Sequence, residues 1–260
     1  MMRATYHTHT YRCKHASGTE EEYILKAIAE GVEILGFADH APMPYENGFV
    51  STYKMLPEEI GDYFESLLTL REIYKDKIDI KIGFETEYYP SLWEKSLKFW
   101  EPYPLDYLIL GQHFAPEEAV PNKSYIAWAS EDKGRVTAFV DAVITGMNTG
   151  VISYVAHPDL INYSGEDGEF FLSELSRLIG EAIRLDIPLE YNLLGMSSGR
   201  NYPNPIFWEE AARLGAKTIL GCDSHSPERV VKRDEVERAR AYLDSLGMTV
   251  LDKIELKPVF

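Results

Sequence analysis

Short apolar runs alternate with longer amphipathic segments along most of the chain, and this alternation predicts parallel strands joined by helices. Runs of strand length occur at Ala4–His7, Ile34–Ala38, Ile78–Phe84, Tyr107–Leu110, Ile152–Ala156, Ile187–Tyr191 and Thr218–Gly221. A further short run at Met248–Ile254 is a candidate for one more strand. The pattern therefore predicts an α/β fold with a sheet of seven parallel strands, to which an eighth is a possible addition.

Helix signals mark the segments between these runs. Thr19 is followed three residues later by Glu22, a capping box, and Gly31 lies just past the end of the same segment. Pro57 suits the first turn of the next helix, where its missing N–H costs nothing. Apolar residues then recur at helical spacing in four sets: Ile60, Phe64, Leu67 and Leu68; Val136, Phe139, Val140 and Val143; Leu172, Leu175, Ile179 and Ile183; and Val236, Ala239, Leu243 and Leu246. We expect these to be crossover helices packed on the sheet.

Length and composition favour one α/β domain over residues 1–260. A chain of 260 residues with 45% hydrophobic content has the size of a single α/β barrel. Its formal charge of −16 argues against a nucleic-acid partner, whose phosphates it would repel. Cys13 and Cys222 are too few for a disulfide framework, and residues 1–12 lack the apolar region of a secretory signal, which favours the cytoplasm. No run approaches the roughly 18 apolar residues of a membrane span.

Potential metal ligands stand at the ends of the predicted strands. In chain order they are His7 and His9, His40, Glu85, His113, His157, and Asp223 with His225. In a parallel barrel the carboxyl ends of all strands open on one face, so residues far apart in sequence converge there. The pattern therefore predicts one cluster of imidazoles and carboxylates.

The spacing and number of these side chains predict a cluster of transition-metal ions. His7 and His9 are two residues apart, so both project on one face of a strand, and the same holds for Asp223 and His225. Imidazole and carboxylate suit Zn²⁺, Mn²⁺ and Fe²⁺, whereas Ca²⁺ and Mg²⁺ prefer oxygen alone. Counting His15 on the first loop, the ligands exceed the four of one tetrahedral ion. We expect two or three divalent ions (Zn, Mn or Fe), with a carboxylate bridging a pair.

Such a cluster is suited to hydrolysis. Paired metal ions lower the pKa of bound water toward about 7 and clamp the attacking and leaving oxygens of an in-line displacement. Their positive charge also gives a small phosphate monoester a local reason to bind to an acidic protein. The chain shows no glycine-rich phosphate loop and no nucleophile elbow, so kinase and serine-hydrolase functions have no comparable support.

Other side chains near the predicted ligands have more ordinary interpretations. Asp39 and Glu87 are expected to accept hydrogen bonds that orient the imidazoles, and Cys13 and Cys222 to be small buried side chains. Arg12, Lys14 and Arg200 are candidate phosphate contacts, of which Arg200, in the loop after the sixth strand, is preferred. Whether Trp93, Trp100, Trp128 and Trp208 line a pocket or fill the core stays open.

The ligand motifs resemble those of the PHP (polymerase and histidinol phosphatase) superfamily. The matching positions are His7-Thr-His9, His15, Asp39-His40, Gly83-Phe-Glu85, Gly111-Gln-His113, Ala156-His157-Pro158 and Asp223-Ser-His225. The stretches Lys77–Pro90, Asp106–Phe114 and Asp223–Glu228 are similar to the histidinol-phosphatase branch. The resemblance covers nearly the whole chain and implies a distorted TIM-like (β/α)7 barrel with a trinuclear centre.

The resemblance also implies a division of the ligands and a reaction. His7, His9, Glu85 and Asp223 would hold the first ion and form the catalytic group; Glu85, His113 and His157 the second; His15, His40 and His225 the third. The reaction would be hydrolysis of L-histidinol phosphate to L-histidinol and phosphate, a step of histidine biosynthesis, with a metal-bridging hydroxide as the nucleophile.

Three alternatives stay open at this point. Relatives with similar metal sites act on nucleotides, oligonucleotides or phosphotyrosine, and a shared fold does not define the leaving group. An amidohydrolase also places H-x-H after its first strand, but it often carries a bridging lysine after its fourth, where this chain has Gln112-His113. A purely structural metal site is the third alternative. The oligomeric state cannot be predicted from the sequence.

Overall fold

The strands form one parallel sheet in chain order. The computed structural model describes residues 2–121 and 123–260. Its sheet has eight strands in the order β1 to β8: Ala4–Thr5, Ile34–His40, Asp79–Thr86, Tyr107–Leu110, Ile152–Val155, Leu189–Asn192, Thr218–Gly221 and Val250–Leu251. The sheet curls, and a parallel bridge between Thr8 and Ser224 joins the segments that follow β1 and β7. The fold is thus the predicted distorted TIM-like barrel, with the candidate eighth strand present as a two-residue pairing on β7.

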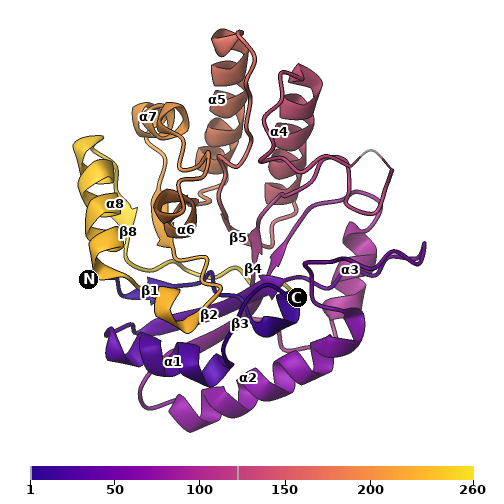
Figure 1. The fold of residues 1–260 in the computed structure, drawn as a ribbon, viewed down its shortest axis with the longest axis vertical. Helices are drawn as coiled ribbons and strands as arrows, with labels where there is room; N and C mark the ends of the chain where they lie inside the picture. Colours follow the sequence, from indigo (N-terminus) through magenta and orange to yellow (C-terminus); the bar gives the residue numbers. More distant parts are fainter. Residues whose placement is uncertain (1, 122) are drawn as a thin grey trace.

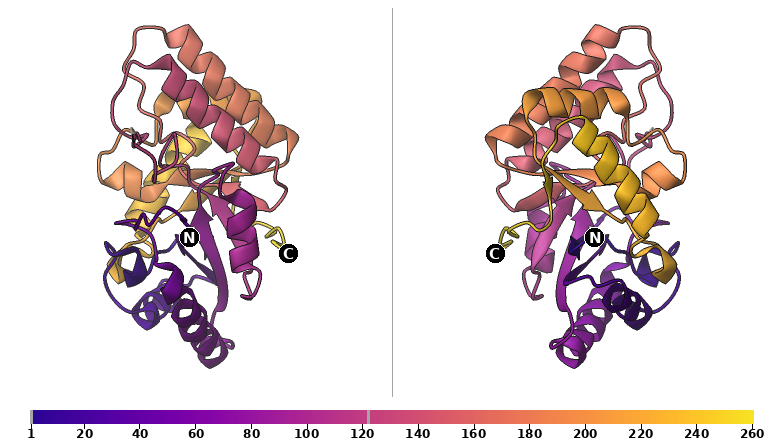
Figure 2. Two further views of the ribbon diagram at one scale, coloured as in Figure 1. Left: turned by 90° about the vertical axis from the view of Figure 1, so that its right-hand side faces the viewer. Right: turned by 90° about the vertical axis from the view of Figure 1, so that its left-hand side faces the viewer.

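Helices surround the curled sheet, as Figures 1 and 2 show. They are α1 (Glu20–Ala29), α2 (Ile60–Tyr74), α3 (Trp93–Trp100), α4 (Lys133–Met147), α5 (Gly168–Arg184), α6 (Leu193–Ser197), α7 (Pro205–Leu214) and α8 (Arg233–Ser245). The predicted capping box opens α1, since the Thr19 side chain accepts from the Glu22 N–H and the Glu22 carboxylate accepts from the Thr19 N–H. Among the described residues no helix combines the length and the apolar character needed to cross a membrane.

The two faces of the sheet carry different side chains. In β4, Leu108 and Leu110 pack in the large core under the helices, whereas Tyr107 and Ile109 belong to a smaller cluster on the inner face. The Tyr107 hydroxyl donates to the Tyr6 carbonyl at 2.6 Å and fills the inside of the barrel. Successive residues of a strand point to opposite faces of the sheet. The inward-facing residues of each strand therefore extend from this cluster to the carboxyl end of that strand.

Burial in the core is wrongly predicted for three residues. Leu68 in α2 is 37% exposed, and in α5 Leu172 is 39% and Ile183 is 40% exposed. Each lies at the margin or the end of its apolar stripe, and only the central part of a stripe contacts the sheet. The remaining members of these two sets, Ile60, Phe64, Leu67, Leu175 and Ile179, are buried.

Three helices lie outside the predicted set. The proline- and aromatic-rich stretch around residues 88–104 contains α3, whose buried Trp100 donates its indole N–H to the Pro42 carbonyl at 3.0 Å. Helix α7 begins with Asn204 as N-cap and Pro205 at its first position, a signal that is present in the sequence. The short α6 is capped by the Asn192 side chain.

Candidate metal centre

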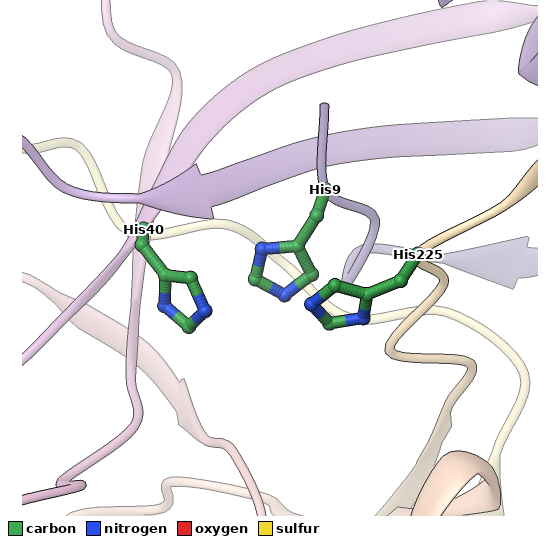
Figure 3. Close-up of side chains that lie close together, drawn as sticks. All are labelled: His9, His40 and His225. Atoms are coloured by element: carbon green, nitrogen blue, oxygen red, sulfur yellow. The ribbon is translucent and has the colours of Figure 1, made fainter. Parts of the chain in front are cut away.

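All nine predicted ligands converge at the carboxyl ends of the strands. His7 and His9 follow β1, His40 ends β2, Glu85 lies near the end of β3, and His113, His157 and Asp223 follow β4, β5 and β7. His15 and His225 close the group from loops, with their ring centres 4.6 Å apart. Figure 3 shows the rings of His9, His40 and His225, from three separate segments, turned toward one another; the ring centre of His9 lies 4.4 Å from that of His40 and 4.1 Å from that of His225.

Four of these side chains bring their ligand atoms close together around His7 and His9. His7 Nε2 lies 3.1 Å from His9 Nε2, 3.6 Å from Glu85 Oε2 and 3.5 Å from Asp223 Oδ1. His9 Nε2 lies 3.7 Å from Glu85 Oε2 and 3.2 Å from Asp223 Oδ1. A tetrahedron whose ligand atoms stand about 2.1 Å from a central ion has edges of about 3.4 Å. The five separations, each of which involves His7 or His9, lie near that value, so the two imidazoles can share a divalent cation with either carboxylate.

Glu85 reaches a second group of imidazoles with its other oxygen. Oε1 lies 2.8 Å from His157 Nε2 and 3.7 Å from His113 Nε2, while Oε2 faces His7 Nε2 and His9 Nε2 and lies 2.8 Å from His40 Nδ1. Both halves of this buried carboxylate thus point at nitrogen atoms on opposite sides. This is the placement that a carboxylate bridging two cations requires.

The third expected group is more open. His225 is partly buried and His15 is exposed, and the ring centres of His15 and His40 are 5.4 Å apart. The Nδ1 atoms of His15 and His225 are hydrogen-bonded to the carbonyls of Cys13 and Asp223, at 2.7 and 3.0 Å. His225 Nε2 is buried and has no hydrogen-bond partner in the described structure. Unpaired buried atoms aimed into a cluster of ligands fit a bound cation.

The charges of the metal-free cluster are strongly coupled. Burial alone would lower the pKa of His7, but Glu190, Asp223 and Glu85 outweigh it and raise that pKa well above its usual value. Burial likewise opposes the charged form of His9, yet hydrogen bonds to Asp223 and Asp39 raise its pKa to about 9. The pKa values of Glu85 and Asp223 are lowered despite their burial, because imidazoles surround them. Glu85 and Asp223 thus favour the protonated forms of His7 and His9, whereas burial lowers the pKa values of His40, His113 and His225.

Asp39 and Glu87 were both predicted to orient imidazoles, and only Asp39 does so directly. Asp39 Oδ1 accepts from His9 Nδ1 at 3.3 Å, so it does orient an imidazole. Glu87 Oε1 instead accepts from the backbone N–H groups of His113 and Phe114, at 2.8 and 3.0 Å. Its other oxygen pairs with the buried Lys54. Glu87 therefore shapes the loop that carries His113, while its carboxylate stays 3.8 Å from the His113 ring.

Two polar residues of β6 were missed by sequence reasoning. Glu190 Oε1 accepts from His7 Nδ1 at 2.9 Å, and Asn192 Nδ2 donates to Asp223 Oδ2 at 3.2 Å. The signal was available, because residues 190 and 192 share one strand face and neighbour an apolar residue on each side. The alternation alone did not predict a functional role for these residues, because β6 contributes no histidine.

Two of the expected ligands have unusual backbone conformations. His157 has φ of 29° and Asp223 has φ of 48°, in the left-handed region that residues other than glycine rarely adopt. Such strain persists only where surrounding contacts over-determine it, and it concentrates at functional sites. The backbone N–H of His157 is held by Glu190 Oε2 at 2.9 Å.

A cavity of about 480 Å³ opens beside the cluster. Its aromatic lining consists of tyrosine and phenylalanine, namely Tyr53, Phe114, Tyr125 and Tyr202, and none of the four tryptophans takes part. Arg200 lines the cavity and donates to the Tyr202 hydroxyl at 2.6 Å. A larger cavity of about 720 Å³ near Met43 and Phe99 contains none of the nine predicted ligands, so the smaller one is the candidate substrate site.

The competing cations are paired away from the cavity, and both cysteines are buried. Arg12 is buried and paired with Glu20 and Asp62, and Lys14 donates to the Ser51 carbonyl at 2.6 Å. Cys13 and Cys222 are buried free thiols, and burial raises the pKa of both, that of Cys222 to about 12. The Sγ atom of Cys13 nevertheless lies within 4.8 Å of ligand atoms of His15 and His225, so this thiol borders the third expected set.

Comparison with known proteins identifies the family. The model of the PHP domain matches residues 5–192, which include the first seven of the nine predicted ligands. The chain belongs to the PHP family. A probable histidinol-phosphatase of Deinococcus radiodurans is 28% identical over 253 residues, covering 94% of each chain. A probable histidinol-phosphatase of Schizosaccharomyces pombe is 27% identical over 278 residues, covering 97% of this chain and 89% of that one. Within the family the chain thus falls in the histidinol-phosphatase branch.

A solved structure of the branch shares the fold of this PHP protein. The histidinol phosphate phosphatase of Lactococcus lactis superimposes with a TM-score of 0.75 and 20% sequence identity, over 98% of this chain and 99% of that one. That structure was determined in complex with zinc, L-histidinol and phosphate.

Proposed function

We propose that this PHP protein is a metal-dependent phosphatase that hydrolyses L-histidinol phosphate to L-histidinol and phosphate. The observation that carries the proposal is the convergence of ligand atoms of His7, His9, Glu85 and Asp223 beside a cavity of about 480 Å³. The curated relatives it matches are histidinol phosphatases, and the zinc, histidinol and phosphate of the Lactococcus structure support the same substrate.

The nine ligands divide into three sets, as the family resemblance implied. His7, His9, Glu85 and Asp223 would hold one ion; Glu85, His113 and His157 a second; and His15, His40 and His225 a third. When bound, zinc, manganese or iron ions would neutralise phosphate charge and supply an activated hydroxide at neutral pH, bridging two ions, as the nucleophile. The spacing around Glu85 supports two adjacent ions, and the buried, unpaired His225 Nε2 supports a third ion held by His15, His40 and His225.

The chain itself would bind and orient the ester. Arg200 lines the cavity beside Asp223 and His225, and its guanidinium can form paired hydrogen bonds to phosphate oxygens. Tyr202 holds that guanidinium through its hydroxyl. The aromatic rings of Tyr53, Phe114 and Tyr125 offer flat apolar surface on which the imidazole ring of histidinol can pack.

The proposal extends to the whole chain and its location. Residues 1–260 would act as one domain, since the rings of His9, near one end, and His225, near the other, have their centres 4.1 Å apart in the same cluster. The free thiols of Cys13 and Cys222 support action in the reducing cytoplasm.

Other substrates are weaker candidates. Nucleoside phosphates and phosphotyrosine would bind to the same ions. The formal charge of −16 disfavours those phosphate esters that belong to anionic polymers. An amidohydrolase function loses support, because Gln112 stands where such an enzyme often has a bridging lysine and its side chain binds backbone groups instead. Its Oε1 accepts from the Tyr88 N–H at 2.9 Å and its Nε2 donates to the Phe114 carbonyl at 2.8 Å.

The test is inorganic phosphate release from L-histidinol phosphate, nucleoside monophosphates and phosphotyrosine by metal-loaded protein. We expect kcat/KM for histidinol phosphate of about 10⁴ M⁻¹s⁻¹ or more, at least about a hundredfold above the other esters. The double variant His9→Ala, Asp223→Ala serves as the inactive control. A dominant rate with another ester would refute the substrate assignment, and no release from any ester would refute the phosphatase.

A further inference from the structure

Glu190 lies inside the cluster without belonging to any of the three expected ligand sets. It is fully buried on the inner face of β6, and both carboxylate oxygens are engaged. Oε1 faces His7 Nδ1 at 2.9 Å, and Oε2 accepts from the backbone N–H of His157 at 2.9 Å. One side chain thus holds expected ligands that follow two different strands, β1 and β5.

The neighbouring strand leaves room for this carboxylate. Gly221 on β7 lies beside Glu190, and a Cβ atom at Gly221 would overlap the Glu190 carboxyl group. The same arrangement occurs at the expected bridging ligand, since a Cβ atom at Gly111 would overlap the carboxyl group of Glu85. Each buried carboxylate therefore occupies a space that the adjacent strand keeps free by having glycine there.

Asn192 fixes the other side of Glu190. Its Nδ2 donates to Glu190 Oε2 at 3.0 Å and to Asp223 Oδ2 at 3.2 Å. Its Oδ1 accepts from the Gly195 N–H at 2.8 Å. Because an amide has two N–H donors and these face two carboxylates, its orientation is determined by the contacts. The Gly195 carbonyl in turn accepts from the Arg200 N–H at 3.1 Å, which connects β6 to the loop that carries Arg200.

These contacts have a direct consequence for His7. A carboxylate can only accept, so its bond to Nδ1 places the proton there and leaves Nε2 as the nitrogen that faces His9, Glu85 and Asp223. A carboxylate behind a metal-binding imidazole also sets the orientation of the ring and its basicity. The contact to the His157 N–H meanwhile supports a backbone with φ of 29°.

We propose that Glu190, supported by Asn192, is a positioning residue of the metal centre: it selects and aims the metal-binding nitrogen of His7 and holds the left-handed backbone of His157. It acts through these two ligands and touches neither substrate nor the reacting atoms. Strand β6, which supplies no ligand of its own, thereby takes part in the centre. The inference rests on the metal centre of the proposed function.

The first test is zinc binding by the metal-stripped Glu190→Gln variant, in competition with a chromophoric chelator. Glutamine keeps the size of the side chain but places an NH₂ group against either His7 Nδ1–H or the His157 N–H. We expect zinc affinity to fall about 10- to 100-fold, and the absorption spectrum of the Co²⁺-loaded protein to shift as ligand geometry changes. The matched control is Glu210→Gln, a buried glutamate of α7 that binds Arg213 and Ser176 away from the cluster. Its zinc affinity should equal that of the wild type.

A second variant reaches the same carboxylate without changing it. Gly221→Ala should displace Glu190 and reproduce the loss of affinity, whereas Gly180→Ala, at an open position in α5, should not. If Glu190→Gln does not fold, as judged by circular dichroism, the Gly221→Ala result decides. If the wild-type protein binds zinc and the variants bind it with affinities within twofold of the wild-type value, this inference alone is overturned. A wild-type protein that binds no zinc would overturn the proposed metal centre as well.

Discussion

The carboxyl group of Glu85 lies where any side chain on Gly111 would be. Glu85 is the residue whose two oxygens face the two groups of imidazoles, and Gly111 follows the adjacent strand β4. Glycine is thus required at position 111 of the G-Q-H motif, because any larger residue would overlap the carboxyl group of Glu85.

The Gly111→Ala variant tests this relationship. The added methyl group should push Glu85 out of place and lower kcat/KM for the phosphate ester by about 100-fold or more, since misplacement by about 1 Å has effects of this size. Metal content after dialysis should fall in parallel. Gly180→Ala in α5, where nothing lies within 4 Å of an added Cβ, should leave both quantities unchanged. Full activity of Gly111→Ala would show that Glu85 has no bridging role.

Arg200 should contribute to binding of the ester rather than to binding of metal. Its removal in Arg200→Ala loses charge-assisted hydrogen bonds to phosphate, so kcat/KM should fall about 10- to 100-fold while zinc stoichiometry stays the same. Arg213→Ala, an arginine of α7 paired with Glu210, is the control. Steady-state kinetics together with metal analysis separate the two effects, and an unchanged kcat/KM would remove Arg200 from the substrate site.

Metal binding should release protons and strengthen as pH rises. The pKa of His9 is raised to about 9 and that of His7 is also raised in the metal-free protein, so both imidazoles hold protons at neutral pH. A metal ligand must be neutral, and each ion that binds therefore displaces protons. Zinc affinity should increase from about pH 6 to about pH 8, below the pKa of His9. Titration calorimetry in buffers of different ionisation enthalpy measures the release; an observed enthalpy independent of buffer would contradict it.

Removal of the metal ions should abolish activity but not the fold. The cores under the helices and inside the barrel are apolar and independent of the ligands. After chelation we expect circular dichroism to retain the helical signal, with a lower melting temperature. At a metal concentration of about 1,000 Kd the lost stabilisation is about 4 kcal/mol. Unfolding of the stripped protein would indicate instead a site that supports the structure, as in closed zinc sites.

The strands and most helices could be predicted because their boundaries carry strong local signals. Strands β4 and β7 have the predicted bounds, Tyr107–Leu110 and Thr218–Gly221. Strand β2 runs two residues further than predicted, because Asp39 and His40 continue the pairing with Phe84 and Glu85. Polar residues at that end gave no strand signal, since their positions depend on the neighbouring strand and not on local propensity.

The candidate ligands could be predicted for a similar reason. Histidine at a strand end is chemically distinctive, and parallel topology alone brings such residues together. Glu190 and Asn192 were missed because a glutamate and an asparagine carry no comparable signal, and their contacts to His7 and Asp223 span 183 and 31 residues of chain. The space that Gly221 leaves for Glu190 depends likewise on strand register, which the sequence pattern did not predict.

The most direct test of the metal centre is an anomalous-scattering map from crystals of the zinc-loaded protein. The account predicts a peak at the centre of His7 Nε2, His9 Nε2, Glu85 Oε2 and Asp223 Oδ1, about 2.1 Å from each atom, and a second peak between Glu85 Oε1 and the rings of His113 and His157. The map of the His9→Ala, Asp223→Ala variant should lack the first peak. No peak among these four atoms in fully loaded wild-type crystals would contradict the account.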